Sequence, residues 1–368
     1  MKLLFFAVTK KQYHYFNKLH HHLSYPSAIY FFPSLRLSLH RENHLSKKEQ
    51  KEILEKKFQE ITIKYPQKTV RFFYKILLKI EFHWISSVLL FAIQKEKPTH
   101  MIVWNGQKFH QEIASLLAKK HHIQNIFFEN GLLPNTTTMD FKGVNAKNSL
   151  SKSPSFYLNY PLLNHSLPHQ LEIRKPYKKQ KIIHQKLPDE YIFVPFQVAY
   201  DTQVLQHSPW IQSMFQLFEL LQWLSKSIQI PFVIKEHPSD RVSNYTSLYK
   251  KTNQNIHFSS ENTQYLIENA TAIITINSTV AIESLLFNKR VILLGDAFFD
   301  IEGIVKRAKT KESLLHIIQT LPQWEVNHTL IHQFLLYLQE VYLIPTHWTR
   351  ADLTHYKCIE KKIQESLC

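Results

Sequence analysis

The sequence is poor in glycine. Only five of its 368 residues are glycine, whereas an average usage of about 7% would give about 26. No window therefore holds the Gly-rich loop of a P-loop nucleotidase or the G-x-G-x-x-G fingerprint of a dinucleotide-binding domain. Collagen-like and low-complexity chains are excluded for the same reason. Where glycine is this rare, each one is expected to mark a backbone position that other residues do not tolerate.

Cysteine and long apolar runs are scarce as well. The two cysteines, Cys358 and Cys368, lie within the last eleven residues, which excludes a disulfide framework and suits a reducing cytoplasm. The longest apolar run, residues 84–93, is about half of the ~20 residues that a membrane-spanning helix needs. The apolar run at residues 3–8 is too short for a signal peptide. We therefore expect a protein that is soluble or bound to a membrane surface.

Acidic residues are few relative to basic ones. Lys and Arg total 45 against 29 Asp and Glu, which gives a formal net charge of +16. Such an excess indicates anionic partners, which include nucleic acid, a phospholipid surface and phosphorylated small molecules. The histidine run His20–His22 shares no metal-ligand spacing with a Cys, Asp or Glu, so no metal site is predicted.

Strand and helix patterns alternate in two blocks, which indicates parallel α/β sheets. Strands are expected at 3–8, 100–104 and 125–128 in the first block, and at 191–195, 231–235, 272–277 and 290–294 in the second. Between the blocks, Arg174–Lys186 holds six cations and no acid, as in an interdomain linker; a surface loop within one domain is the alternative. We predict α/β domains at 1–173 and 190–310, a basic linker at 174–189 and a helical tail at 311–368. This is the outline of a GT-B glycosyltransferase, in which the donor binds in the cleft between the domains.

The segment 272–283 carries the most informative motif. A buried strand runs into Asn277-Ser278-Thr279, where an apolar-periodic helix begins. Ser278 or Asn277 can cap that helix and leave free N–H groups at its positive end. Together with the hydroxyl groups, this predicts a phosphate-binding turn that needs no glycine. An ordinary helix cap without a ligand is the alternative.

A second strand ends in Lys235 and His237, about forty residues earlier. Pro238 favours an extended conformation at His237. A cation and an imidazole at the carboxyl end of a strand suit a nucleotide phosphate or a leaving group. A His-Pro pair alone is better explained as a structural turn, but the strand–helix unit that separates it from Asn277 favours a site.

Two carboxylates follow strands in different blocks. Glu129 ends a strand at the turn Asn130-Gly131, and Asp201 follows the first strand of the second block, just after Gln197. A carboxylate at a strand end that faces a cleft is a candidate general acid or base. Two of them from opposite domains suit transfer through an oxocarbenium-like transition state. The alternative for Glu129 is a solvated turn in which Asn130-Gly131 supplies positive φ.

Together these motifs resemble the bacterial capsule polysaccharide biosynthesis family, which contains retaining β-Kdo transferases that start capsule chains on a phospholipid. The similar residues, in the family's order, are Phe128-Glu129-Asn130-Gly131, Asp140 with Gly143-Val144-Asn145, Gln197 with Asp201, Lys235-Glu236-His237-Pro238, Asn277-Ser278-Thr279-Val280 with Glu283, and Leu294-Gly295-Asp296. The resemblance covers most of residues 1–305. Asn130 stands where many relatives carry Asp, and the lipid-priming branch is similar in having Asn there.

The resemblance implies a GT-B-like fold with two Rossmann-like domains, a central cleft and a helical C-terminal tail. It implies retaining transfer of Kdo from CMP-Kdo to a phosphatidylglycerol-type or Kdo-primed acceptor, with no cofactor besides this donor. The first domain would be the acceptor side, and the second would bind the nucleotide sugar. By position, the CMP phosphate would be held by Lys235, His237, Asn277, Ser278 and Thr279, and Glu283 is a candidate for binding the nucleotide. Asp201 is assigned as nucleophile and Glu129 as acid/base. The acceptor or structural motifs contain Asn130, Gly131, Asp140, Asn145 and Gln197.

An anionic phospholipid acceptor would place the protein at the cytoplasmic face of the inner membrane, as a peripheral protein. Each cation near such a surface contributes about 1 kcal/mol of attraction, and we expect Arg174–Lys186 and the basic helices to supply it. Other capsule assembly proteins are further candidate partners. The rival enzyme classes are polyol-phosphate and sialic-acid transferases of GT-B fold. A basic nucleic-acid binder and an inactive scaffold are the rivals of another class, although the dispersed cations and the lack of an RNP-like motif or Cys/His finger argue against nucleic acid.

Overall fold

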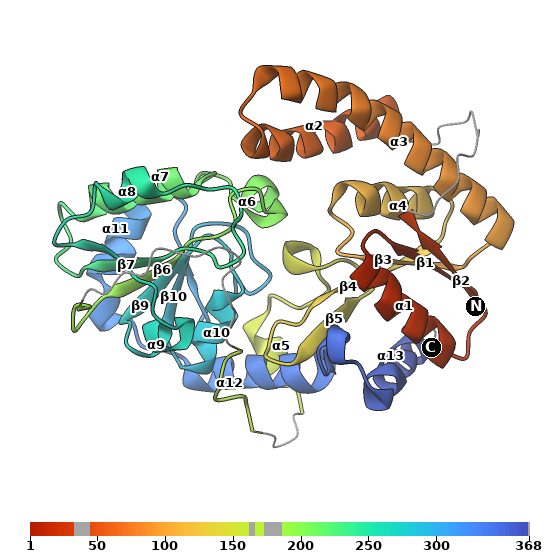
Figure 1. The fold of residues 1–368 in the computed structure, drawn as a ribbon. Coiled ribbons are helices and arrows are strands. Elements are labelled where there is room, and N and C mark those ends of the chain that lie inside the picture. Colours follow the sequence, from red (N-terminus) through yellow and green to blue (C-terminus); the bar gives the residue numbers. More distant parts are fainter. Residues whose placement is uncertain (33–44, 162–165, 173–185, 367–368) are drawn as a thin grey trace. The chain divides into compact units, whose positions relative to one another are not determined.

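The computed structural model describes residues 1–32, 45–161, 166–172 and 186–366, and the chain divides into two compact units (Figure 1). Unit 1 consists of Met1–Ser149 and Tyr342–Cys368, and unit 2 of Leu150–Val341. Each unit is built on a six-stranded sheet with helices packed against it. The predicted fold class, α/β with two Rossmann-like domains of GT-B-like type, is confirmed.

The sheet of unit 1 has the strand order β12-β5-β4-β3-β1-β2. Its strands are β1 (Leu3–Ala7), β2 (Ser27–Phe31), β3 (His100–Trp104), β4 (Gln124–Asn130), β5 (Thr136–Asp140) and β12 (Leu343–Pro345). The first four are parallel, whereas β5 and β12 add an antiparallel edge. From β1 the chain passes to β2 on one side and later returns to β3 on the other. The carboxyl ends of β1 and β3 are therefore a topological switch point, which is where open α/β sheets bind ligands.

Helices cover both faces of this sheet. They are α1 (Lys10–His22), α2 (Lys47–Lys64), α3 (Lys68–Glu96), α4 (Phe109–Lys120) and α13 (Leu353–Glu365). Successive side chains of a strand point to opposite faces, so Leu3 and Phe5 of β1 pack with α1 and α13, while Leu4 and Phe6 pack with α2, α3 and α4. Because β1 is buried on both faces, its sequence is a continuous apolar run.

The sheet of unit 2 is parallel throughout and has the order β11-β10-β9-β6-β7-β8. Its strands are β6 (Ile192–Pro195), β7 (Phe232–Lys235), β8 (Ile256–Phe258), β9 (Ala272–Thr275), β10 (Arg290–Leu293) and β11 (Lys306–Arg307). The helices are α5 (Pro154–Leu158), α6 (Thr202–His207), α7 (Met214–Leu224), α8 (Thr246–Tyr249), α9 (Thr263–Glu268), α10 (Val280–Leu286), α11 (Lys311–Gln319) and α12 (His328–Tyr337). From β6 the chain builds β7 and β8 on one side and then β9 to β11 on the other, so the switch point lies between β6 and β9.

The units are bounded differently from the predicted domains. The boundary at 173–174 and most of the basic run Arg174–Lys186 lie outside the described residues, as does Cys368. The predicted tail 311–368 is divided between the units. Phe334 of α12 packs on Tyr157 of α5 in unit 2, whereas β12 pairs with β5 in unit 1. Edge pairing by β12 and the apolar face of α13 explain why the end of the chain completes unit 1.

His355 fixes α13 in the core of unit 1, where its side chain is fully buried. Its Nδ1 lies 2.8 Å from the carbonyl oxygen of Pro345, and its Nε2 lies 2.8 Å from the Tyr15 hydroxyl. A carbonyl only accepts hydrogen bonds, so Nδ1 carries the proton and Nε2 accepts from Tyr15. Burial lowers the pKa of His355 although both Pro345 and Thr346 present carbonyl oxygens to the ring.

We expect His355 to make folding pH-dependent. In the unfolded chain a histidine takes up its proton near pH 6.5, whereas folded His355 resists protonation to lower pH. The contribution of His355 to the free energy of unfolding is therefore complete above about pH 6.5. It is lost as the pH falls toward the pKa of the folded state, at up to about 1.4 kcal/mol per pH unit. His355→Leu should lower the free energy of unfolding at neutral pH, yet make it less dependent on pH between about 7.5 and 5.5.

Urea unfolding at several pH values measures both effects. His332→Leu, at an exposed position of α12, is the matched control and should leave the pH dependence unchanged. Equal pH dependence in the wild type and in His355→Leu would contradict a neutral, buried His355.

Candidate functional site residues in the two units

Gln197 and Asn277 meet at the switch point of unit 2. Gln197 follows β6 and donates from Nε2 to Oδ1 of Asn277 over 3.0 Å. Its Oε1 accepts from the backbone N–H of Asn277 at 3.2 Å and from the Thr275 hydroxyl at 3.3 Å. Both amide side chains are buried. This exchange joins the two central strands beyond their last backbone hydrogen bonds.

The remaining polar group of Asn277 contacts two nearby segments, the helix α6 and the loop after β10. Its Nδ2 lies 3.0 Å from the carbonyl oxygen of Gln203, 3.2 Å from that of His207 and 3.3 Å from that of Asp296. At the adjacent Gly295, a Cβ would lie 2.8 Å from the His207 carbonyl oxygen, which explains why glycine stands there. Both polar atoms of the Asn277 side chain are thus engaged within the protein. Asn277 positions the turn, and the predicted contact with phosphate is left to Ser278 and Thr279.

Ser278 and Thr279 play different parts at the start of α10. The Ser278 hydroxyl accepts from the backbone N–H of Val280 at 3.2 Å, so the capping alternative is realised in this residue. The Thr279 hydroxyl makes no hydrogen bond within the part of the chain that the structure describes, and the residue is half-buried. Glu283 lies one turn further along α10 and is buried. Thr279 is the hydroxyl of this turn that is available to a ligand.

Lys235 and His237 lie at the end of β7, the strand next to β6. Nζ of Lys235 donates to the carbonyl oxygen of Glu261; burial lowers the pKa of Lys235, and the Glu261 carboxylate opposes that shift. Nδ1 of His237 accepts from the Ser239 N–H at 3.0 Å, so in the neutral ring Nε2 carries the proton. The His-Pro segment is therefore a turn, as in the structural alternative, and Nε2 is the donor atom of its neutral imidazole.

The strand order β7-β6-β9 brings these residues to one edge of the sheet. Parallel strands end at the same edge, so the segments that carry Lys235 and His237, Gln197, and Ser278 and Thr279 are neighbours in that order. Asp201 belongs to the loop after β6, where it caps α6 by accepting from the Gln203 N–H at 2.9 Å. Its side chain is exposed. Unit 2 thus places the segments after β7, β6 and β9 at one edge of its sheet.

In unit 1, Glu129 lies near the end of β4 and is held by three donors. Oε1 accepts from the indole N–H of Trp104 at 3.2 Å and from the Asn130 backbone N–H at 2.9 Å, and Oε2 accepts from Nδ2 of Asn105 at 2.6 Å. Trp104 ends the neighbouring strand β3, and Asn105 follows it. Asn105 has φ +64° and Gly106 has φ +74°, and a Cβ at Gly106 would lie 2.3 Å from the ring of Phe127. This left-handed turn brings the Asn105 amide to the carboxylate.

Aromatic rings surround the turn that follows Glu129. Trp348 lies in the short 3-10 helix η5 (Trp348–Arg350) and donates from its indole N–H to Oδ1 of Asn130 over 2.8 Å. Its ring centre lies 4.6 Å from that of Trp104. Trp104, Asn105 and Trp348 were not predicted from the sequence. The rare Gly106 is the sequence signal that could have found the first two, whereas Trp348 stands 218 residues from Asn130 and gave no local signal.

Asp140 has a structural role within its motif. Its buried carboxylate accepts from the backbone N–H groups of Lys142, Gly143 and Ser149 and from the hydroxyls of Ser149 and Tyr342, at 2.6 to 3.0 Å. These five bonds leave it no capacity for a ligand. Asn145 follows with φ +56°, and a Cβ at Gly131 would lie 1.9 Å from the Thr136 hydroxyl. Of the acceptor or structural roles predicted for this motif, the contacts of Asp140 support the structural one.

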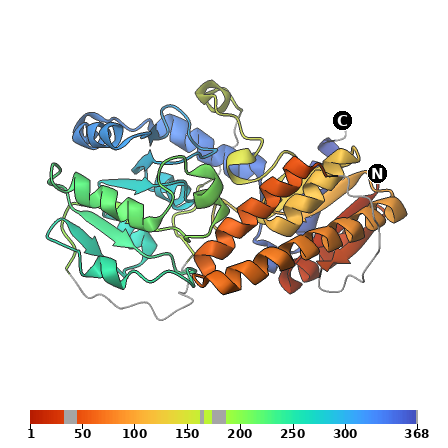
Figure 2. The same ribbon diagram turned by 90° about the horizontal axis from the view of Figure 1, so that it is seen from above.

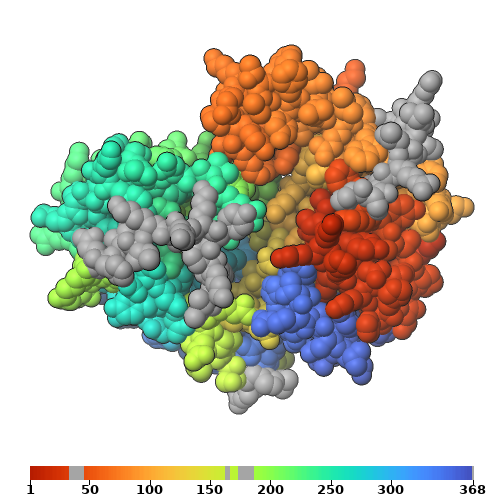
Figure 3. All heavy atoms as spheres, in the orientation of Figure 1, coloured from red at the N-terminus to blue at the C-terminus, as the bar shows by residue number. Residues whose placement is uncertain are grey.

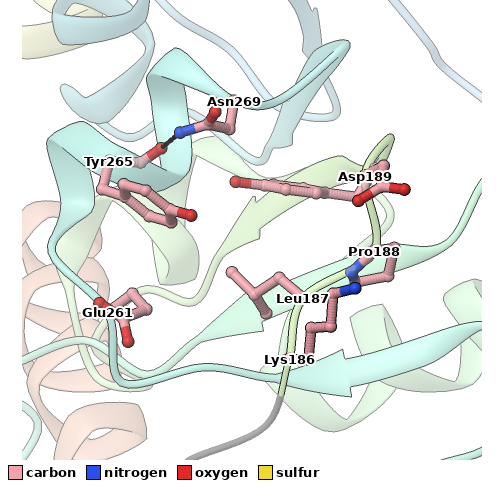
Figure 4. Close-up of a pocket in the computed structure, with 8 residues that line it drawn as sticks. Lys186, Leu187, Pro188, Asp189, Glu261, Tyr265 and Asn269 are labelled. Carbon is pink, nitrogen blue, oxygen red and sulfur yellow. Dashed lines mark hydrogen bonds between the residues drawn. The ribbon is translucent and has the colours of Figure 1, made fainter.

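A cavity of about 400 Å³ opens elsewhere in unit 2 (Figure 4). It is lined by Lys186, Leu187, Pro188, Asp189, Tyr191, Glu261, Tyr265 and Asn269. Figure 4 shows the Tyr265 ring and the Asp189 and Lys186 side chains around the opening, with Asn269 bonded back to the carbonyl oxygen of Tyr265 at 2.9 Å. Lys186–Tyr191 precede β6, whereas Glu261, Tyr265 and Asn269 lie in and around α9. None of the predicted site residues lines it.

The architecture defines a class: an α/β protein of GT-B-like type with polar residues collected at the carboxyl edge of each sheet. Within that class, the chain belongs to the capsule polysaccharide biosynthesis family, as its sequence resemblance predicted. The family model described as "Capsule polysaccharide biosynthesis protein" matches residues 168–343. "Protein FixF" of Sinorhizobium fredii is 32% identical over an alignment of 294 residues that covers 76% of this chain and 71% of that protein.

Other relatives are more distant. "Capsule polysaccharide export protein KpsS" of Escherichia coli is 26% identical over 259 residues, which cover 53% of this chain and 66% of that protein. Among solved structures, the "beta Kdo 2,7 transferase" of Thermosulfurimonas dismutans KpsC is similar with a TM-score of 0.49 and 12% identity, over 99% of this chain and 100% of that one.

Proposed function

We propose that this protein is a glycosyltransferase of capsule polysaccharide biosynthesis that transfers Kdo from CMP-Kdo to a phospholipid or Kdo-primed acceptor. The observation that carries the proposal is the edge formed by β7, β6 and β9. It collects the Lys235 cation, the His237 imidazole and the Thr279 hydroxyl at the switch point of a parallel sheet, where nucleotide ligands bind in this architecture. The motif resemblance to the Kdo transferases of the family supports this donor.

Each predicted residue has a chemical role in this reaction. A nucleotide phosphate leaves as an anion, so it needs charge stabilisation and not a proton; Lys235, His237 and Thr279 supply donors for that charge. In a retaining double displacement, the Asp201 carboxylate attacks the anomeric carbon and the bond to the CMP phosphate breaks. Glu129 then takes the proton of the acceptor hydroxyl, whose oxygen displaces Asp201. The rigid hold on Glu129 by Trp104 and Asn105 suits a general base whose position must be fixed.

The experiment is donor turnover by the full chain. We expect CMP release from CMP-Kdo, and faster release with phosphatidylglycerol present. CMP-sialate and CDP-glycerol, supplied separately, should not be consumed. If CMP is released from CMP-sialate alone or from CDP-glycerol alone, the protein belongs to the corresponding rival class of transferase. If no donor is consumed and the protein binds nucleic acid tightly at physiological salt, it is the nucleic-acid binder instead.

Thr279→Val tests the edge itself in the same assay. Removing one hydrogen bond to a charged group costs about 1.5 kcal/mol or more, so KM for CMP-Kdo should rise about tenfold or more. Thr271→Val, at a half-buried threonine just before β9, is the matched control and should leave KM unchanged. An unchanged KM in Thr279→Val would remove this turn from the donor site.

A further inference from the structure

The first half of α3 exposes a stripe of large apolar side chains. Five of the thirteen exposed large hydrophobic residues in the described part of the chain fall within nine positions of this helix, and each exposes between 46% and 64% of its surface. They are Phe72, Phe73, Ile76, Leu77 and Ile80. At about 100° per residue they cover an arc of about 140° on one side of the helix. We refer to these five residues as the α3 stripe.

The opposite face of the same segment is already packed. Leu78 and Phe82 are buried in the core of unit 1, and both Tyr74 and Phe58 of α2 pack against that core. Figures 1 and 2 show α2 and α3 as neighbouring helices, and Figure 3 shows their orange surface open on the face drawn. A helix face made of large apolar side chains is normally buried. The α3 stripe therefore exposes apolar side chains that would normally be packed against another surface.

The charges beside the stripe are of one sign. Residues 68–80 contain Lys68, Arg71, Lys75 and Lys79 and no acid. By the same helical arithmetic Lys68, Lys75 and Lys79 lie along one flank of the stripe, and all three are exposed. Within the described residues none of these four cations forms an ion pair, whereas the α2 lysines 56, 57 and 64 are paired with glutamates. The missing partner of this surface is both apolar and anionic.

We infer that the α3 stripe is the surface by which this protein docks on an anionic phospholipid bilayer. An interfacial helix buries its apolar side chains at the boundary of headgroups and acyl chains while flanking lysines reach the phosphates. The inference deepens the proposed function and rests on it for its purpose, because a lipid-linked acceptor must be reached at the membrane surface. The basic run Arg174–Lys186, predicted to serve this contact, lies outside the described residues except for Lys186.

Two other coverings of the stripe fit less well. α3 is long and apolar enough to cross a membrane by length and composition, but half of its most apolar window is buried inside the protein. Spanning would pull Phe82, Ile85 and Leu89 out of the core. A second copy of the chain would bring Lys75 and Lys79 against the same cations, with no acid in 68–80 to pair with them.

Vesicle co-sedimentation of the full chain tests the inference. Wild type should bind vesicles containing phosphatidylglycerol more tightly than vesicles of phosphatidylcholine alone, and less tightly as salt rises. Phe72→Ser with Phe73→Ser should weaken binding about a hundredfold, at about tenfold per aromatic side chain. Lys75→Gln with Lys79→Gln should weaken it about fivefold per cation, and only on the anionic vesicles. Leu353→Ser, at a position of α13 that is 64% exposed, is the control and should bind as wild type does.

The competing results overturn the inference in distinct ways. Unchanged vesicle binding in the Phe72/Phe73 variant would remove the stripe from the contact. Resistance of the bound wild type to alkaline carbonate extraction would indicate a membrane span, and a dimer that dissociates in that variant would indicate a second copy. CMP release measured without lipid should be the same in stripe variants and wild type. If that release is absent while stripe-dependent vesicle binding persists, the proposed function fails and the docking surface stands.

Discussion

Glu129→Gln is expected to lower the rate of Kdo transfer by about 10²- to 10⁴-fold, the range that one general acid/base group supplies. Glutamine keeps the size of the side chain and can still accept from Trp104 and from the Asn130 N–H, but it cannot take the proton of an acceptor hydroxyl. Its amide also turns an N–H toward the Asn105 amide, which lies 2.6 Å from Oε2 in the wild type. A modest loss of stability is therefore expected together with the loss of rate.

The loss of rate can be told apart from the loss of stability by measuring CMP release and transfer separately. Because Glu129 acts on the acceptor, CMP release in the first turnover should persist in Glu129→Gln while transfer to the acceptor fails. Glu360→Gln is the matched control, since Glu360 also lies in unit 1 and accepts a backbone N–H, from Ser24 at 2.9 Å; its transfer rate should equal that of wild type. A Glu129→Gln protein that transfers at the wild-type rate would exclude Glu129 from the chemistry.

The sequence pattern predicted the buried strands well and the edge strands poorly. The strand at 100–104 is found at the predicted positions, and those at 3–8, 191–195, 231–235 and 290–294 are each within one residue of prediction at both ends, because parallel strands buried on both faces are continuous apolar runs. β5 was missed: three of its five residues, Thr136 to Thr138, are threonines that are buried without being apolar. β8 and β12 have three residues each, too short for any periodicity to stand out.

The site residues could likewise be predicted where the signal is local in the sequence and not where the contact joins distant segments. The segments carrying Gln197, Asn277 and Lys235 were placed at strand ends from the sequence alone, and parallel pairing then brought them to one edge. The hold on Asn130 by Trp348 depends on the return of the chain through β12, whose register sets Leu343 opposite Thr138. That pairing joins segments about two hundred residues apart through backbone bonds, which are independent of side-chain identity. Asp140 shows both cases, because its bonds to Lys142 and Gly143 are local and its bond from Tyr342 is not.

Asp201→Asn is expected to abolish transfer as completely as Glu129→Gln does, but at an earlier step. Asp201 is exposed and caps α6 through Oδ1. Asparagine caps a helix about as well as aspartate, so the variant should keep the fold of this loop and its carbonyl bonds to Asn277. What it loses is the carboxylate that would form the bond to the sugar. CMP release should therefore fall together with transfer, in contrast to Glu129→Gln, where release persists.

Azide can report which carboxylate forms the covalent bond. In Glu129→Gln the sugar is still carried to Asp201 with one inversion, and azide attack on that intermediate inverts it again, so the glycosyl azide keeps the configuration of the donor. In Asp201→Asn no intermediate forms, and azide that displaces CMP directly gives the inverted product. Product configuration is measured by NMR. If instead Glu129→Gln gives the inverted glycosyl azide and Asp201→Asn gives the retained one, the roles of Asp201 and Glu129 are exchanged. The carboxylate whose removal inverts the azide product is the nucleophile.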